Sequence, residues 1–75
     1  MYPGDANILC LSAKANLALK RFTEAQDRLE KAIRLFPDFA NAHDIYGDLL
    51  FMQGHTDAAI EVYGQALRLD PTKSD

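Results

Sequence analysis

Two short stretches decide the fold: EKAIRLFP at residues 30–37 and GQALRLDP at residues 64–71. They align without a gap, and each ends in proline. The interval from Pro37 to Pro71, which we call the repeat period, also separates Pro3 from Pro37. The same period relates five pairs of apolar or small residues: Ala25 and Ala59, Leu29 and Tyr63, Ala32 and Ala66, Ile33 and Leu67, and Leu35 and Leu69. So many matches at one spacing in 75 residues indicate an internal repeat.

Each copy of the repeat carries a helical pattern, because its apolar residues recur at steps of three and four. The steps run through Ala25, Leu29, Ala32, Ile33 and Phe36, and again through Ala59, Ile60, Tyr63, Ala66 and Leu67. We predict an all-α fold of antiparallel helix–turn–helix repeats. Its four helices are expected at about 6–19, 23–36, 39–53 and 57–69. Repeat one would cover 6–37 and repeat two 40–71, with residues 1–5 ending a preceding repeat.

Local signals predict the ends of these helices. Thr23 and Gln26 have the spacing of a capping box, and Asp57 aligns with Thr23. Asp5 and Asp38 stand where they would cap the two remaining helices. On the outer face of 23–36, three acid-before-base pairs are spaced for ion pairs: Glu24–Arg28, Asp27–Lys31 and Glu30–Arg34. This charged face is a solvated surface or, alternatively, a docking strip.

Three glycines in the second copy have different predicted roles. Gly47 aligns with Ala13, where the two helices of a hairpin should approach most closely. Gly54 aligns with Lys20 between two helices, where a left-handed or extended residue ends the first of them. Gly64 aligns with Glu30 on the polar face, and the sequence gives it no packing role.

Composition excludes several classes of protein. A single cysteine, Cys10, rules out an intrachain disulfide and hence a disulfide-built secreted scaffold. The longest apolar runs have four residues, far below the ~20 that span a bilayer, so no membrane insertion is expected. No secretory signal is visible at the N-terminus, which favours a cytoplasmic location.

The charge is unevenly distributed. Residues 1–37 hold six basic and four acidic side chains, giving +2, and residues 38–75 hold two basic and seven acidic, giving −5. Nucleic acid is not an expected partner, because binding phosphates needs a clustered basic surface. The opposite charges of the two halves would instead favour head-to-tail association.

A helical repeat of this length that ends in proline resembles the tetratricopeptide repeat. Residues 40–71 follow the family pattern with His43-x2-Tyr46-Gly47-x2-Leu50 and then Ala59-x3-Tyr63-x2-Ala66-x4-Pro71. Residues 6–37 follow it less closely, with Leu9-x2-Ser12-Ala13-x2-Asn16 and then Ala25-x3-Leu29-x2-Ala32-x4-Pro37. His43 and Asn16 replace the usual large aromatic residues. The resemblance covers nearly the whole chain.

The resemblance implies a module for protein–protein interaction, a scaffold with no catalytic activity and no cofactor. We expect its two repeats to be part of a longer repeat array. In this family the first helix of each hairpin lines a concave groove that holds peptides. The matching positions here are Asn7, Cys10, Lys14, Leu17, Asn41, Asp44, Asp48, Phe51 and Met52. This surface suits an extended protein segment with a Lys or Arg and an aliphatic side chain. Asp44 and Asp48 would repel the acidic chaperone tails that some such repeats bind.

Three alternatives remain open from the sequence. Leu17, Phe51 and Met52 would pack against a neighbouring copy if they do not bind a peptide. The face of 57–69 that includes Ile60, Tyr63 and Leu67 would be open, so the isolated chain is expected to self-associate as a homo-oligomer. The chain would then be an accessory or oligomerisation segment of a larger enzyme or assembly protein.

Catalysis and metal binding have little support in the sequence. Asp44 and Asp48 are one helical turn apart and could share a cation with His43 or His55. No zinc or calcium ligand spacing is present, and the glycines do not form a phosphate loop. We therefore expect His43 to be a packing residue, with the aspartates on a solvated face, and we expect no metal.

Overall fold

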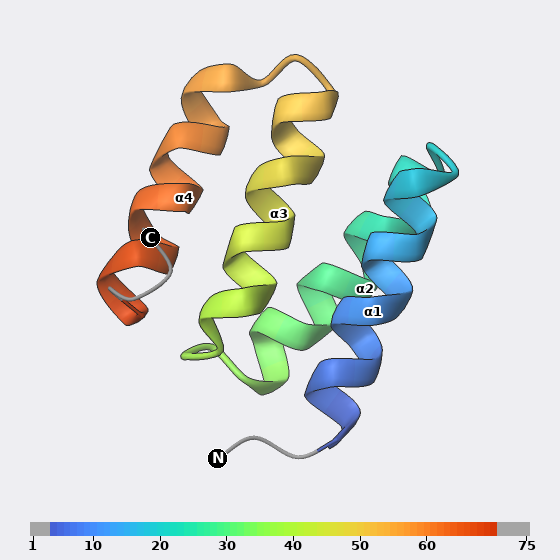
Figure 1. The fold of residues 1–75 in the computed structure, drawn as a ribbon, viewed down its shortest axis with the longest axis vertical. Helices are drawn as coiled ribbons and strands as arrows, with labels where there is room; N and C mark the ends of the chain where they lie inside the picture. The colour runs from blue at the N-terminus through green and yellow to red at the C-terminus, as the bar shows by residue number, and fades with distance from the viewer. Residues whose placement is uncertain (1–3, 71–75) are drawn as a thin grey trace.

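The computed structural model describes residues 4–70, which form α1 (Gly4–Ala18), α2 (Phe22–Leu35), α3 (Ala40–Met52) and α4 (Thr56–Leu69). Figure 1 shows two antiparallel hairpins, α1–α2 and α3–α4, standing side by side. The predicted all-α class is confirmed, and each helix begins and ends within two residues of its expected limits. Pro71, expected to end repeat two, lies outside the described residues. Gly4 and Asp5, expected to end a preceding repeat, lie in α1.

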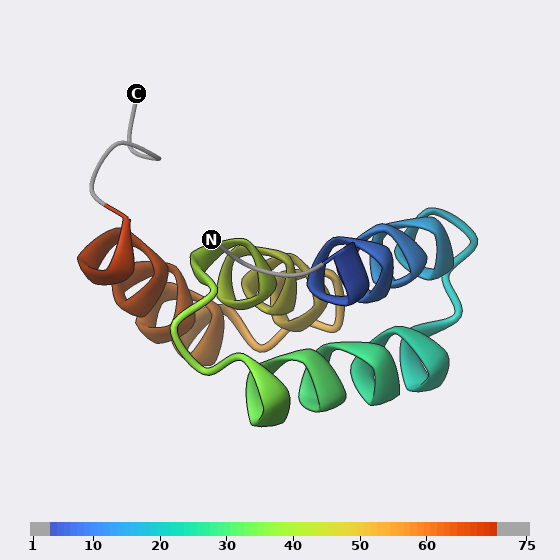
Figure 2. The same cartoon turned by 90° about the horizontal axis from the view of Figure 1, so that it is seen from below.

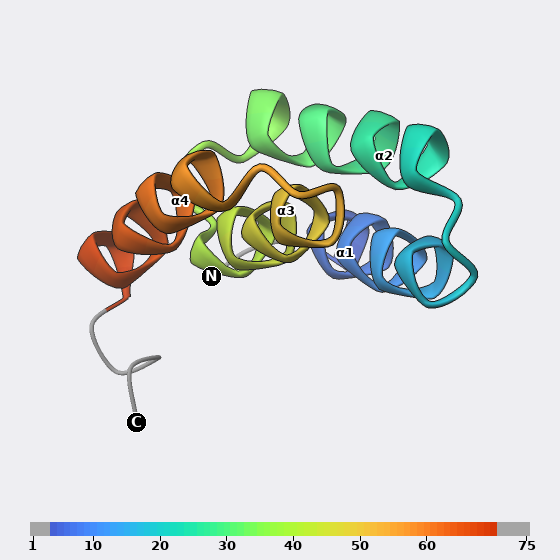
Figure 3. The same ribbon diagram turned by 90° about the horizontal axis from the view of Figure 1, so that it is seen from above.

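The helices form two unequal layers. In Figures 2 and 3, α1 and α3 lie side by side and α2 lies against the space between them, while α4 lies beyond α3. Accordingly α2 contacts both α1 and α3, whereas α4 contacts only α3 among the described helices. The first hairpin is therefore covered by α3 on one side, and the second hairpin has no equivalent cover within residues 4–70.

The core lies where α1, α2 and α3 meet. It is built from small residues that let the helices approach and from a few large ones that fill the space between them. Its buried members are Cys10, Ala13, Leu17, Ala25, Leu29, Ala32, Ala42, Ile45 and Leu49. Four of these residues, Ala13, Ala25, Leu29 and Ala32, belong to the predicted repeat pattern.

The turns within the two hairpins have the same backbone conformation and the same hydrogen-bond pattern. Lys20 and Gly54 both have a positive φ, of 61° and 88°. The amide of Arg21 donates to the carbonyl of Asn16 (2.8 Å), and the amide of His55 donates to that of Leu50 (2.8 Å). These bonds close a left-handed helix end of the Schellman type. Gly54 was expected to be left-handed or extended, and it is left-handed; in the first hairpin a lysine takes the same conformation.

The predicted side-chain caps are wrong. The N-caps of α2 and α4 are Arg21 and His55, and neither makes a side-chain capping bond. The reason is the shortness of the turn: the residue that closes one helix through its amide opens the next through its carbonyl, which accepts from Ala25 (3.0 Å) and Ala59 (2.9 Å). Thr23 and Asp57 therefore fall inside the first turns, as Asp5 does in α1.

The cap expected at Asp38 and the ion pairs expected on α2 are also not formed in the described chain. The N-cap of α3 is Phe39, one residue after Asp38. On α2, Arg28 lies 3.3 Å from its neighbour Asp27, and Glu30 accepts a hydrogen bond from Gln26 (2.9 Å). Exposed side chains of this length exchange partners at little cost, because each pair is worth only a few tenths of a kcal/mol.

Gly47 lies at a close contact between α3 and α4, the kind of place predicted for it. A Cβ atom at this position would lie 2.6 Å from Cε1 and 2.7 Å from Cδ1 of the Tyr63 ring. The ring therefore lies directly on the glycine backbone. A Cβ at Gly64 would meet nothing within 4 Å, so no packing contact in the described chain explains that glycine.

Candidate functional site

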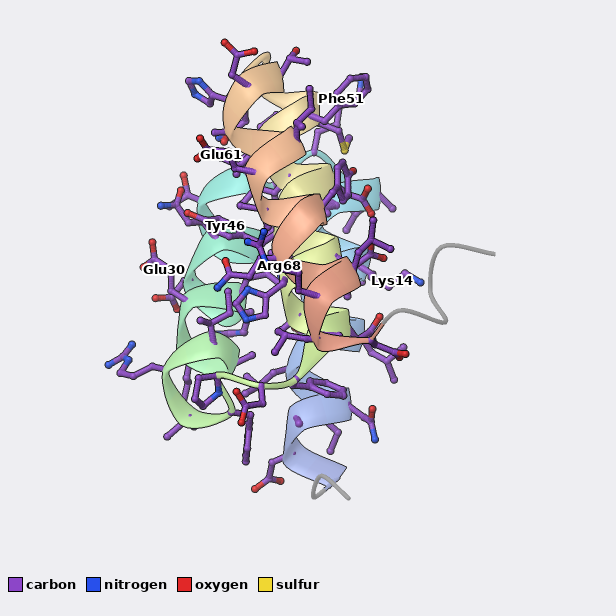
Figure 4. The ribbon with its side chains drawn as sticks, turned by 90° about the vertical axis from the view of Figure 1, so that its left-hand side faces the viewer. Lys14, Glu30, Tyr46, Phe51, Glu61 and Arg68 are labelled. Atoms are coloured by element: carbon purple, nitrogen blue, oxygen red, sulfur yellow. The ribbon has the colours of Figure 1, made fainter. Side chains whose placement is uncertain are left out.

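A pocket opens between the C-terminal halves of α1 and α3. It has a volume of about 260 Å³ and is lined by Lys14, Leu17, Ala18, Asp48, Phe51 and Met52. The lining is mostly hydrocarbon, with one ammonium group and one carboxylate added to it. Figure 4 shows Lys14 and Phe51 on one side of the molecule and Glu30 and Glu61 on the other. We call the surface along α1 and α3 that holds this pocket the groove.

The pocket contains five of the nine residues predicted for a peptide site: Lys14, Leu17, Asp48, Phe51 and Met52. Phe51 is 60% exposed and Met52 is 45% exposed, while Leu17 is nearly buried and forms the floor. Asn7, Asn41 and Asp44 lie outside the pocket. Sequence reasoning missed Ala18, although it stands one repeat period before Met52 and was therefore available from the repeat.

Cys10 does not line the groove. It is 1% exposed and belongs to the core cluster with Ala42, Ile45 and Leu49 of α3. The neighbouring hairpin covers this position, so its thiol is a packing group. The residue one repeat period later, Asp44, is only partly buried, because no described helix covers the second hairpin in the same way.

The carboxylate of Asp48 is hydrogen-bonded to a residue of α4. The hydroxyl of Tyr63 donates a hydrogen bond to Oδ1 of Asp48. Burial, this hydrogen bond and the nearby charges of Asp48 and Asp44 all raise the pKa of Tyr63, because each disfavours the phenolate. Tyr63 therefore remains a neutral donor, and it connects the groove to the packing between α3 and α4.

Three residues of α4 were expected on an open face. Ile60 and Leu67 are 63% and 40% exposed, as expected of such a face. Tyr63 is instead partly buried, with its ring on Gly47 and its hydroxyl on Asp48. The absence of a side chain at residue 47 creates the space that receives this ring.

His43 is a buried packing residue with one polar contact. It is 6% exposed, and its Nε2 donates to the carbonyl of Pro37 at 2.8 Å, which ties α3 to the connection from α2. Within residues 4–70, no group of three or more His, Cys, Asp or Glu side chains is arranged to hold a metal. Nor does this part of the chain contain a helix long and apolar enough to cross a bilayer.

Comparisons with known proteins agree with this architecture. A family profile described as the tetratricopeptide repeat matches residues 10–74. Over 61 residues the chain is 36% identical to the BBSome complex member BBS4 of Mus musculus and 34% identical to the BBSome complex member BBS4 of Bos taurus. Each alignment covers 76% of this chain and 11% of the relative, so the chain spans about a tenth of these proteins. No solved structure matches the chain significantly.

The repeat period, the two helical hairpins and the profile match all point to the same family. The repeats of this family typically act as non-catalytic modules for protein–protein interaction, and stacked hairpins of this kind present extended concave surfaces to their partners. The chain belongs to the tetratricopeptide repeat family.

Proposed function

We propose that the groove between α1 and α3 binds an extended protein segment that carries an aliphatic side chain next to a Lys or Arg. The observation that carries this proposal is the composition of the pocket. Four apolar side chains, Leu17, Ala18, Phe51 and Met52, surround one carboxylate that is already held in place. The pocket volume of about 260 Å³ suits a side chain better than a drug-sized ligand, which needs about 300–1,000 Å³.

The preference for an aliphatic side chain and the preference for a cation have different physical causes. Phe51 and Met52 are largely exposed, so covering them with an aliphatic side chain removes apolar surface from water, at about 25 cal/mol per Å². Asp48 supplies the charge preference. Since Tyr63 donates to one of its oxygens, one orientation of the carboxylate is favoured before any ligand arrives, which lowers the ordering cost of binding. Lys14, on the same rim, disfavours a cation placed on the α1 side.

A selection experiment tests this proposal. A library of random peptides displayed against the 75-residue chain should enrich sequences in which an aliphatic residue lies within a few positions of Lys or Arg. Asp48→Lys should reverse the charge preference, and Phe51→Ala should weaken selected peptides about tenfold, since truncating an anchor in a pocket typically costs more than about 1 kcal/mol.

Matched controls separate the groove from the rest of the surface. Glu61→Lys makes the same charge change on the opposite side of the molecule, and Ile60→Ala removes an equally exposed apolar side chain outside the pocket. Both controls should retain the selected peptides. Selection that is unchanged in Asp48→Lys and Phe51→Ala would mean that the groove is not the binding surface.

A second candidate function is an accessory role in a larger assembly, with self-association through the open repeat faces. It is favoured by the names of the two relatives, which are members of a complex, and by the small share of their length that the chain covers. Ile60 and Leu67 are the exposed residues that such association would cover. Light scattering from micromolar to millimolar chain tests this role. A mass of one chain throughout would exclude self-association.

A further inference from the structure

In the first hairpin, the surface that packs against the next hairpin is covered by α3. Cys10, Leu17 and Leu29 are covered by α3, which contributes Ala42, Ile45 and Leu49 to the same cluster. Every one of these six residues is 6% exposed or less. The chain thus contains one complete contact between a hairpin and an adjacent helix.

The second hairpin presents the equivalent surface uncovered. Phe51 stands one repeat period after Leu17 and is 60% exposed, against 6% for Leu17. Leu67 stands one repeat period after Ile33, which packs against the core, yet it is 40% exposed. We call this surface, at the α3–α4 end in Figure 1, the end face: Asp44, Asp48, Phe51, Tyr63 and Leu67. Both α3 and α4 contribute residues to this surface. Within residues 4–70, α4 contacts only α3, so no further helix packs on it.

The end face differs from its covered counterpart in charge. Asp44 takes the place of Cys10, and Asp48 takes the place of Lys14. The two carboxylates are four residues apart on α3, so they repel each other. The hydroxyl of Tyr63 donates to Asp48 but adds no positive charge. An apolar helix docked here would cover Asp44 at the position where Cys10 is 1% exposed, and covering a carboxylate without a cation is costly.

We propose that the end face docks an amphipathic helix of a protein partner that lies along α3 as α3 lies along α1 and carries a Lys or Arg opposite Asp44. The apolar positions of that helix would cover Phe51 and Leu67, and its cation would offset the two carboxylates. This surface overlaps the peptide groove without coinciding with it. The two share Phe51 and Asp48, but Asp44 and Leu67 belong to the end face alone.

A second copy of the chain is a poorer occupant for the same reason. Its α1 would present the residues that stand one repeat period before Ala42 and Ile45, which are Ile8 and Leu11. Both are exposed and apolar, so the shape of the contact would be retained. Neither supplies a cation to Asp44, however. The sequence of α1 therefore provides a probe in which one residue can be changed to test the charge requirement.

Three synthetic peptides of residues 4–21, all with Cys10→Ser to prevent oxidation, test the proposal by calorimetric titration into the 75-residue chain. One keeps Leu11, one carries Leu11→Arg and one carries Leu11→Glu. Leu, Arg and Glu have similar helix propensities, so the peptides differ mainly in charge. The Leu11→Arg peptide should bind about tenfold more tightly than the Leu11 peptide, and the Leu11→Glu peptide should bind most weakly.

Variants of the protein identify the surface used. Asp44→Asn should abolish the advantage of the Leu11→Arg peptide, whereas Leu67→Ser should weaken the Leu11 and Leu11→Arg peptides alike. Lys14→Ala and Met52→Ser, which change only the groove, should leave both affinities unchanged, and circular dichroism should show all four variants folded. Equal affinity of the Leu11 and Leu11→Arg peptides would overturn the charge requirement and favour a second copy. Loss of binding in Lys14→Ala would place the peptides in the groove, and no binding at all would also overturn the proposal.

Discussion

The two hairpins share one backbone design but fill it differently. In the first hairpin Ala13 and the fully buried Leu29 belong to one apolar core cluster, and at the aligned positions of the second hairpin Gly47 contacts the partly buried Tyr63. The exchange moves side-chain volume from one helix to the other and adds a hydroxyl, which donates to Asp48. A close contact that is purely apolar in one hairpin therefore becomes, in the other, a contact that also orients a carboxylate in the groove.

The largest expected effect comes from giving the second hairpin the small residue of the first. Gly47→Ala places a Cβ 2.6 Å from the Tyr63 ring, which must shift and release Asp48. We expect the free energy of unfolding in urea to fall by about 2 kcal/mol, as for other overpacked sites.

The double variant Gly47→Ala with Tyr63→Leu recreates the pair of the first hairpin. It should recover most of the stability lost by Gly47→Ala, so the double-mutant cycle should show strong coupling. Additive effects would contradict the assignment of this contact.

The next effect concerns the turns. Lys20 and Gly54 have the same left-handed conformation, which costs a residue with a side chain about 1 kcal/mol more than glycine. Lys20→Gly should therefore raise the unfolding free energy by up to this amount, and Gly54→Ala should lower it similarly. Thermal and urea denaturation measure both. Lys31→Gly, in the middle of α2, is the control, and it should be destabilising.

The smallest effect is a difference in alkaline stability. The pKa of Tyr63 is raised above its usual 10.0, so the folded state holds this proton more tightly than the unfolded chain does. Its contribution to stability is therefore complete below pH 10 and is lost as the pH rises through the higher pKa of the folded state. The free energy of unfolding of Tyr63→Phe should be lower than that of the wild type at neutral pH. The difference between the two should become smaller above pH 10.

Denaturation midpoints measured on both sides of that pH provide the comparison. Asp48→Asn keeps an acceptor for the hydroxyl but removes the negative charge that disfavours the phenolate. It should therefore show a smaller alkaline loss than the wild type. Identical alkaline curves for the wild type and Tyr63→Phe would mean that this hydroxyl contributes nothing.

The internal repeat allowed most of the fold to be predicted from the sequence. Positions such as Ala25 and Ala59 are buried in both copies, so one alignment located the packed faces of both hairpins. The caps were not readable, because Thr23 and Asp57 have the right chemistry for an N-cap but the tight turns begin each helix earlier. The backbone of the turn, which the sequence indicates only through Gly54, determines where these helices start.

The sequence predicted only part of the candidate site, namely residues of the pocket between the C-terminal halves of α1 and α3. Lys14, Asp48 and Phe51 were placed correctly on one surface by their spacing on two helices. Cys10 was misplaced because periodicity indicates which side of a helix a residue occupies but not how far the neighbouring helix extends over it. The link from Tyr63 to Asp48 depends on space left by a missing side chain, which a pattern of residue types does not measure.

The turns also determine how an array of such units can deform. The amides of Arg21 and His55 close one helix and their carbonyls open the next, so only residues 19–21 and 53–55 separate the members of each hairpin. Between the hairpins, the chain passes from Leu35 to Ala40 and is held by the bond from His43 to the carbonyl of Pro37. Any bending between two hairpins must therefore alter this connection together with the contacts that α3 makes with α1 and α2.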